Sequence, residues 1–223
     1  MINLKALAFD VYSTLFDTQS VVSECEAAFP GQGERLSRLW RVKQLQRTRW
    51  CVLSGRYNDL WHIMDDALLS ACRDMRLSCS KELREHLRNQ YLCLKDFPEV
   101  AAALRALGER YMLAILSNGT ASMITATIGH RGLTGAFAAI LSADSVRTFK
   151  PHPRVYELAE RTLKLPRAQI GYVSANPFDM AGAKGFGLST IWLHRETGPS
   201  RLMGLMSDIS ISNLSELVSL LRK

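Results

Sequence analysis

Short apolar runs that alternate with amphipathic helical segments constrain the fold of this chain more than any other feature. Each run has the length of a buried strand, and the apolar residues between the later runs fall at helical spacing. Such alternation is typical of a doubly wound parallel sheet with helices on both faces. We therefore expect an α/β protein with a Rossmann-like core, whose strands lie at 4–9, 111–116, 137–141, 170–173 and 189–193.

The segment between the first two predicted strands breaks this alternation. Residues 16–95 are nearly all helical in pattern, which is far more than a single crossover helix needs. We interpret them as an all-helical cap inserted into a core made of 1–15 and 96–223. The helical patterns within the predicted cap cover 36–47, 57–77 and 81–93.

Composition narrows the possible partners. The net charge of +7 is spread over dispersed lysines and arginines, which favours small anionic substrates and argues against nucleic acid. The 5 cysteines are odd in number and show no metal-binding spacing, so we expect reduced thiols in a cytoplasmic protein. Neither a signal peptide nor an apolar stretch long enough to span a bilayer is visible, so we expect no membrane association.

Polar side chains follow four of the predicted strands at the point where each strand ends. In an open parallel sheet these ends meet at one edge, where ligands bind. Taken singly, such residues often have ordinary roles, because an aspartate after a strand can cap a helix and most lysines are exposed in loops. Their joint placement favours one active site, and its members are Asp10, Ser117, Asn118, Lys150, Ser174, Asn176 and Asp179.

The order and spacing of these residues resemble the four motifs of the haloacid dehalogenase superfamily. The matching segments are 10–15, 117–118, 150–151 and 173–179, so the resemblance spans nearly the whole chain. It implies the same fold that the alternation of strands and helices predicts.

Two departures from the common superfamily pattern point to one subfamily. Most members are magnesium-dependent phosphatases, which carry a second aspartate two residues after the nucleophile. This chain has Tyr12 there, and it has Ser-x-Asn at 174–176 in place of the usual Gly-Asp. Together with segments 40–45, 55–57 and 154–160, these departures resemble the (S)-2-haloacid dehalogenases.

The resemblance implies hydrolysis of short (S)-2-haloalkanoic acids to (R)-2-hydroxy acids, with no metal and no cofactor. Asp10 would attack C2 and form an ester, which water would hydrolyse at the Asp10 carbonyl. Thr14 would hold Asp10, and Lys150 would offset the clustered negative charge and keep Asp10 ionised. The residues implied to position Lys150 and the water are Tyr156, Ser174, Asn176 and Asp179.

By the same resemblance, Arg41, Asn118 and Phe178 would bind the departing halide. Arg41 suits this role because its charge does not titrate, and the edge of the Phe178 ring carries partial positive charge. Ser117 and the main-chain N–H groups that follow Asp10 would bind the substrate carboxylate. The other implied substrate contacts are Val11 and Tyr12 in that main chain, and Leu45, Leu60 and Trp61 as an apolar wall.

Two other functions stay open on the residues alone. One is a magnesium-dependent phosphatase of the same fold, although a single carboxylate beside Asp10 is a poor site for a hard cation. The other is a non-catalytic binding protein, because a fold alone does not imply a function. The resemblance also implies a homodimer through the cap helices, whereas the preferred halide and chain length are not readable from the sequence.

Overall fold

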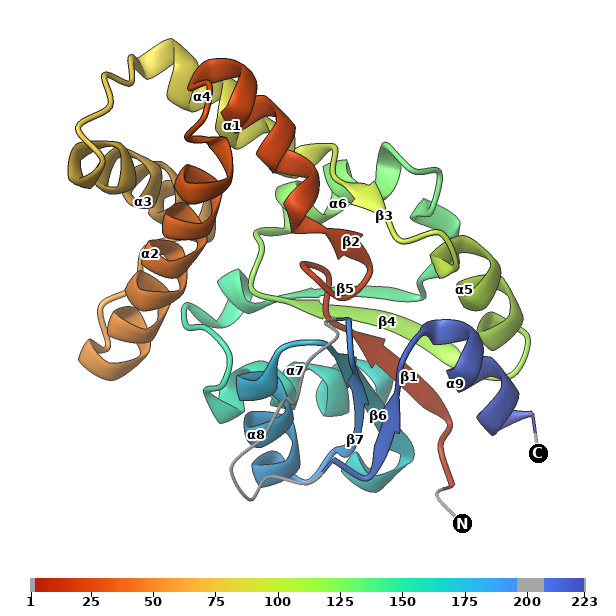
Figure 1. The fold of residues 1–223 in the computed structure, drawn as a ribbon. Helices are drawn as coiled ribbons and strands as arrows, with labels where there is room; N and C mark the ends of the chain where they lie inside the picture. The colour runs from red at the N-terminus through yellow and green to blue at the C-terminus, as the bar shows by residue number, and fades with distance from the viewer. Residues whose placement is uncertain (1–2, 196–206, 223) are drawn as a thin grey trace.

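A six-stranded parallel sheet forms the core of the computed structural model, which describes residues 3–195 and 207–222. The strand order is β5-β4-β1-β6-β7-β8, with helices on both faces (Figure 1). This confirms the predicted doubly wound α/β fold. The strands are β1 (Ala6–Phe9), β4 (Met112–Ser117), β5 (Ala139–Ser142), β6 (Ile170–Ser174), β7 (Ser189–Leu193) and β8 (Ile209–Ile211).

The side chains of the central strand β1 alternate between two hydrophobic cores. Leu7 and Phe9 face one core, whereas Ala6 and Ala8 face the other. Alternation between two buried faces explains why β1 reads as a continuous apolar run. The first core lies under α5 (Val100–Gly108), α6 (Ala121–Gly129) and α9 (Leu214–Leu221), and the second under α7 (Pro153–Leu163) and α8 (Pro177–Phe186).

Parallel register brings the ends of three strands to the same edge of the sheet. Phe9 pairs with Ile115 on one side and with Val173 on the other. The residues that follow these positions, Asp10 among them, therefore emerge together at the carboxyl edge. This edge is the place where an open parallel sheet binds its ligands.

A block of four helices stands over this edge, away from both chain termini (Figure 1). The chain enters the block through β2 (Phe16–Asp17) and leaves it through β3 (Lys95–Asp96), and these short strands pair antiparallel. The block coheres through its own core, where Trp40 Nε1 donates a hydrogen bond to the Met64 carbonyl at 2.8 Å. Its helices are α1 (Val22–Ala28), α2 (Gly33–Ser54), α3 (Leu60–Asp74) and α4 (Lys81–Asn89).

Several element boundaries differ from those expected. Helix α2 continues past residue 47 to Ser54, where Gly55 ends it at a φ of 67°. Helix α3 begins at Leu60 rather than at 57, because the Asp59 side chain caps it by accepting from His62 N. The sequence also predicts a helix that holds Pro98 in its first turn, whereas α5 begins two residues later, at Val100.

At the C-terminal end, the spacing of Asn213 and Glu216 predicts a capping box for the last helix, and Asn213 Oδ1 does accept from Glu216 N at 3.0 Å at the start of α9. The glycines at 198 and 204, with Pro199 and Ser200 between them, predict a loop, and this segment lies outside the described residues. No helix in the described part of the chain is both long and apolar enough to cross a membrane. The 3₁₀ helices are Thr18–Val21, Gln90–Leu92, Thr134–Ala136, Ala143–Val146 and Arg167–Gln169.

Candidate active site

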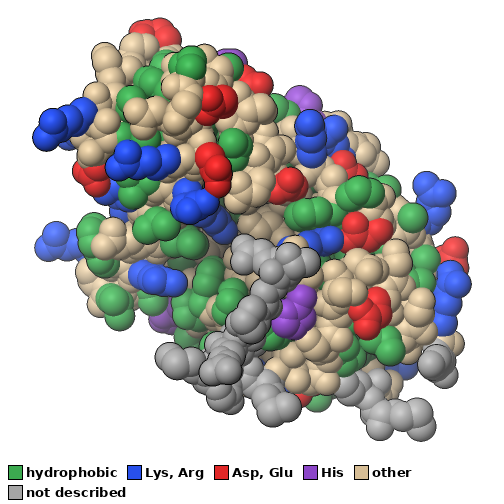
Figure 2. All heavy atoms as spheres, in the orientation of Figure 1, with side chains coloured by type: hydrophobic (Ala, Val, Ile, Leu, Met, Phe, Trp, Pro, Cys, Tyr) green, Lys and Arg blue, Asp and Glu red, His purple; other side chains and the backbone are tan. Residues whose placement is uncertain are grey.

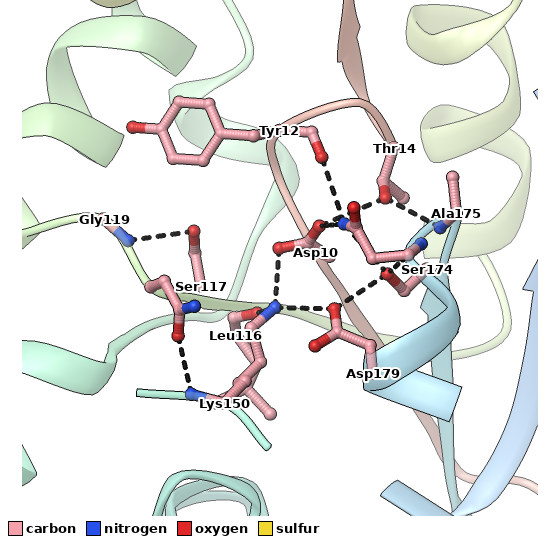
Figure 3. A network of polar contacts seen from close by, with 12 residues as sticks. Asp10, Tyr12, Thr14, Leu116, Ser117, Gly119, Lys150, Ser174, Ala175 and Asp179 are labelled. Atoms are coloured by element: carbon pink, nitrogen blue, oxygen red, sulfur yellow. Dashed lines mark hydrogen bonds and ion pairs between the residues drawn. The ribbon is translucent and has the colours of Figure 1, made fainter. Parts of the chain in front are cut away.

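Asp10 lies at the centre of a buried polar network at the carboxyl edge of the sheet (Figure 3). Its Oδ1 accepts from Lys150 Nζ at 2.6 Å, and its Oδ2 accepts from Asn176 Nδ2 at 2.6 Å and from Thr14 Oγ1 at 3.3 Å. Asp10 itself is only 3% exposed. A carboxylate offers about four lone-pair sites, so these three donors leave one free for a bond to substrate.

Lys150 is the only cation bonded to Asp10 in the described part of the chain, and it is saturated with acceptors. Its Nζ lies 2.6 Å from Asp10 Oδ1, 2.9 Å from Asp179 Oδ2, 2.7 Å from Tyr172 Oη and 3.3 Å from the Leu116 carbonyl. Burial lowers the pKa of this lysine, but the two carboxylates outweigh burial, and the net pKa is raised. Lys150 therefore acts as a fixed positive charge.

Asp179 is the second carboxylate that holds Lys150. Its Oδ2 accepts from Lys150 Nζ, from Ser174 Oγ at 2.8 Å and from Tyr172 Oη at 2.9 Å. Burial raises the pKa of Asp179, and the attraction of Lys150 opposes that rise. Two carboxylates around one ammonium leave a net negative charge, which favours a further cation nearby.

The side chain of Asn176 shows whether the carboxyl edge of the sheet could bind a divalent cation beside Asp10. Its Nδ2 donates to Asp10 Oδ2 and lies 3.4 Å from the carbonyl oxygen of Tyr12. A hard divalent cation would need oxygen at this place, and the chain presents an N–H donor instead. Among residues 3–195 and 207–222, no three His, Cys, Asp or Glu side chains are grouped so as to hold a metal ion.

A small pocket opens in front of Asp10, between the core and the helical block. Its volume is about 20 Å³, which is room for about one water molecule. Arg41 lies on its wall, and its Nη1 donates to Gln44 Oε1 at 2.6 Å, which orients the guanidinium. The lining residues are Asp10, Tyr12, Arg41, Gln44, Leu45, Leu60, Asn118, Lys150, Asn176 and Phe178.

Asn118 links this pocket to the loop that carries Lys150. Its Oδ1 accepts from the backbone N–H of Lys150 at 2.8 Å. The amide nitrogen of Asn118 is thereby left to donate to a ligand. With Arg41 and Phe178 on the same lining, the three residues expected to bind a halide are brought together.

Tyr12 shapes the turn after Asp10 without reaching toward the carboxylate. Figure 3 shows its ring pointing away from Asp10. A Cβ at Gly119 would lie 2.9 Å from the Tyr12 hydroxyl oxygen, so only glycine leaves room for this ring. The next residue, Ser13, has a φ of 64°, and its hydroxyl lies 2.9 Å from Thr18 Oγ1. This hydrogen bond helps to hold a side chain in a conformation that favours glycine.

Not every expected residue reaches the pocket. Trp61 is absent from the lining, and the guanidinium of Arg88 lies 4.2 Å from the centre of its ring. Val11 and Ser117 also lie behind the lining, where Ser117 Oγ accepts from Gly119 N at 3.2 Å. Tyr156 contacts Lys150 only indirectly, because its hydroxyl lies 3.4 Å from the backbone carbonyl of Asp179.

Two residues of the site were not foreseen from the sequence. Tyr172 bonds both Lys150 and Asp179, yet in the sequence it reads as one more apolar position of strand β6. Gln44 is 6% exposed although it is polar, and it lies one helical turn after Arg41. This spacing is the signal in the sequence that could have placed Gln44 beside Arg41, since residues three apart share a helix face.

Comparison with known proteins places this geometry in a family. The model of the haloacid dehalogenase-like hydrolases matches residues 4–187. An (S)-2-haloacid dehalogenase of Pseudomonas sp. (strain YL) is 43% identical, covering 97% of this chain and 94% of its own. Haloacetate dehalogenase H-2 of Moraxella sp. (strain B) is 40% identical, covering 99% of each chain.

A solved structure agrees with these sequence matches. L-2-haloacid dehalogenase from Xanthobacter autotrophicus, with chloropropionic acid covalently bound, superposes with a TM-score of 0.91. It is 33% identical to this chain, and the match covers 98% of both chains. The chain belongs to the haloacid dehalogenase-like hydrolases and, within them, to the group of the (S)-2-haloacid dehalogenases.

Proposed function

We propose that this protein hydrolyses (S)-2-haloalkanoic acids to (R)-2-hydroxy acids through an ester on Asp10. The observation that carries the proposal is the environment of Asp10. Its carboxylate is buried and held by Lys150, Asn176 and Thr14, and it faces a small pocket with Arg41 on the wall. A carboxylate held in this way is oriented to attack carbon.

In the first step, Asp10 attacks C2 of the substrate from the side opposite the halogen. The carbon–oxygen bond forms while the carbon–halogen bond breaks, so the configuration at C2 inverts. Arg41, the Asn118 amide and the edge of Phe178 stabilise the halide as its negative charge develops. The positive charges of Lys150 and Arg41 also favour the approach of the anionic substrate.

In the second step, water attacks the carbonyl carbon of the Asp10 ester. The bond between this carbon and the substrate oxygen breaks, and the Asp10 carboxylate is regenerated. One proton of the water passes to the departing alkoxide to give the hydroxy acid, and the other is released to bulk water. The free lone pair of Asp10 lies on Oδ1, so the oxyanion of this step forms on Oδ2, where Asn176 Nδ2 and Thr14 Oγ1 already donate and stabilise it. Asp179 holds Lys150 in place, and its Oδ1, which makes no hydrogen bond within the described residues, is available to orient the water.

We propose that neither step uses a metal. The residues beside Asp10 do not fit a magnesium site, because the Asn176 amide donates where the cation would need an oxygen ligand. Displacement at carbon also creates no phosphoryl charge that a metal must neutralise.

Halide release from (S)-2-chloropropionate tests the proposed function. We expect turnover that survives removal of divalent cations with a chelator. Phosphate release from an aryl phosphate in the presence of magnesium, without any halide release, would favour the phosphatase instead. Asp10→Asn removes the nucleophile, so we expect it to abolish halide release, whereas a non-catalytic protein would show no halide release before or after the substitution.

We also propose a homodimer, formed through the helical block. The apolar face of α3 does not support it, because residues such as Ile63 and Leu68 are already buried within the same chain. The support comes from α2, where Val42 and Trp50 are 55% and 54% exposed. Light scattering of the wild type and of Trp50→Lys tests this, and a monomeric wild type would contradict it.

A cytoplasmic location is part of the same proposal. All five cysteines are free thiols, as is usual for proteins in a reducing compartment. Fractionation of cells that express the protein would test it, and recovery from the periplasm would contradict it.

A further inference from the structure

An apolar groove adjoins the reaction pocket and has no role in the chemistry described above. Its volume is about 290 Å³, against about 20 Å³ for the reaction pocket. The two cavities share Leu45, Lys150 and Phe178 in their linings, so the groove begins where the reaction pocket ends.

The groove lies between α2 and the core. Leu45, Thr48 and Val52 recur at helical spacing and form one face of α2. Pro151 and Phe178 form the opposite wall, next to Lys150 and at the start of α8. The two turns of α2 beyond residue 47, which were not expected from the sequence, therefore supply much of this groove.

The chemistry of the lining favours hydrocarbon. Five of the eight lining residues are apolar, namely Leu45, Val52, Leu53, Pro151 and Phe178. Leu53 is 84% exposed, an unusual position for a large apolar side chain. Figure 2 shows hydrophobic side chains interspersed with basic ones on the face where α2 lies.

A second neighbouring cavity has the opposite character. Its volume is about 300 Å³, and it meets the reaction pocket at Arg41, Leu45 and Asn176. Ser13, Gln19 and His194 give it a polar lining, which suits water and ions. A substrate that carries both a carboxylate and an alkyl chain would thus meet a polar and an apolar space on either side of Asp10.

We propose that the apolar groove binds the alkyl chain of the substrate beyond C3, so that the protein acts on medium-chain 2-haloalkanoates such as 2-bromohexanoate. This inference rests on the proposed function. The reaction pocket has no room for a longer chain, and the chain can leave it past Leu45 and Phe178 into the groove. Each methylene moved from water into such a space favours binding by a factor of about four at most.

Halide release from the (S) forms of 2-bromobutanoate and 2-bromohexanoate tests the proposal directly. We expect kcat/KM to rise severalfold for the longer acid, up to about fifteenfold for two buried methylenes. Hexanoate should also inhibit more strongly than butanoate, which measures binding without chemistry. Equal or falling values along both series would overturn the proposal.

Two variants locate the effect in the groove. Val52→Gln and Leu53→Gln place amides in its wall, so each should lower the ratio of kcat/KM for hexanoate over butanoate derivatives toward one. Leu53 is largely exposed, so its variant keeps the test valid if Val52→Gln folds poorly. Met112→Gln is the control, because Met112 is exposed on β4, outside both the groove and α2, and the ratio should not move.

Failure of this inference and failure of the proposed function give different results. No halide release from any 2-haloacid would contradict the function and the inference together. Release from 2-bromobutanoate without a gain for 2-bromohexanoate would contradict the groove alone. If Val52→Gln and Leu53→Gln changed the oligomeric state but left the chain-length ratio unchanged, a second copy of the chain would cover the groove and the inference would be wrong.

Discussion

The amide nitrogen of Asn176 lies 2.6 Å from Asp10 Oδ2 and 3.4 Å from the carbonyl oxygen of Tyr12. A neutral donor in this place holds the nucleophile without adding charge. An aspartate at the same position would add a second carboxylate and convert a donor into an acceptor.

Asn176→Asp should therefore lower halide release and create affinity for divalent cations. The repulsion between two adjacent carboxylates would protonate one of them or recruit a cation. We expect kcat to fall by about a hundredfold or more, the usual scale for loss of one oriented donor in an active site. Calorimetric titration with magnesium checks the second effect, and unchanged kcat with no magnesium binding would contradict this account of Asn176.

Tyr172→Phe tests the bridge between Lys150 and Asp179. The phenyl ring keeps the packing, whereas the hydroxyl contacts at 2.7 and 2.9 Å are lost. We expect kcat to fall by about tenfold with little change in KM, and the free energy of unfolding to fall by about 1 kcal/mol. Tyr156→Phe is the matched control, because its hydroxyl makes only a 3.4 Å contact to a carbonyl. Equal effects of the two substitutions would show that the bridge has no special role.

The dependence of stability on pH follows from Lys150, whose pKa is raised above the ordinary 10.5. The folded protein keeps this proton at a pH where the unfolded chain has lost it. The stabilisation by Lys150 is thus complete below pH 10.5. It is lost as the pH rises through the higher pKa that Lys150 has in the folded protein. Urea denaturation should show falling stability above about pH 10, where the buried tyrosines act in the same direction.

Activity should follow the same titration. Because Lys150 stays charged, kcat should hold between about pH 7 and pH 10. Lys150→Met should abolish halide release and lower the free energy of unfolding by about 3–5 kcal/mol, since it leaves Asp10 and Asp179 buried without a cation. A decline of kcat centred well below pH 10 would contradict a raised pKa at Lys150.

Tyr57→Phe tests a contact between the helical block and the core. Tyr57 Oη donates to Asp144 Oδ1 at 2.6 Å, and its ring lies 5.2 Å from that of Phe149, the residue before Lys150. Loss of a partly buried hydrogen bond to a carboxylate should cost about 1–2 kcal/mol of stability. Chemical denaturation measures this cost, and limited proteolysis should cut the 55–59 segment faster. Unchanged values for both would show that the contact contributes nothing.

The sequence predicted the sheet well because its central strands are buried on both faces. An apolar run such as 6–9 has the length of a strand, and the carboxylate and turn that follow it mark where the strand ends. β2 and β3 are two residues long, and such strands carry no periodicity to detect. They pair because the chain enters and leaves the helical block at the same place. This proximity is set by the fold and not by the local sequence.

The site was predicted as a set of positions, but its contacts were not. Asp10, Lys150 and Asp179 meet as expected, because parallel strands bring their ends to one edge. The role of Tyr172 is not visible in the sequence, because tyrosine is a common residue in strands. The sequence also does not say in which direction the Tyr172 hydroxyl points. The family resemblance implies Trp61 as part of the pocket wall, yet its ring packs against the guanidinium of Arg88 instead. Helical spacing cannot tell these two faces of α3 apart.

A single turnover in water enriched in heavy oxygen tests the central claim most directly. With enzyme in excess over substrate, water attacks the Asp10 ester, so the label should enter the carboxylate of Asp10 and the first hydroxy acid should carry none. Mass spectrometry of the peptide that contains Asp10, and of the product, measures both. Label in the first product, with none in Asp10, would contradict the account.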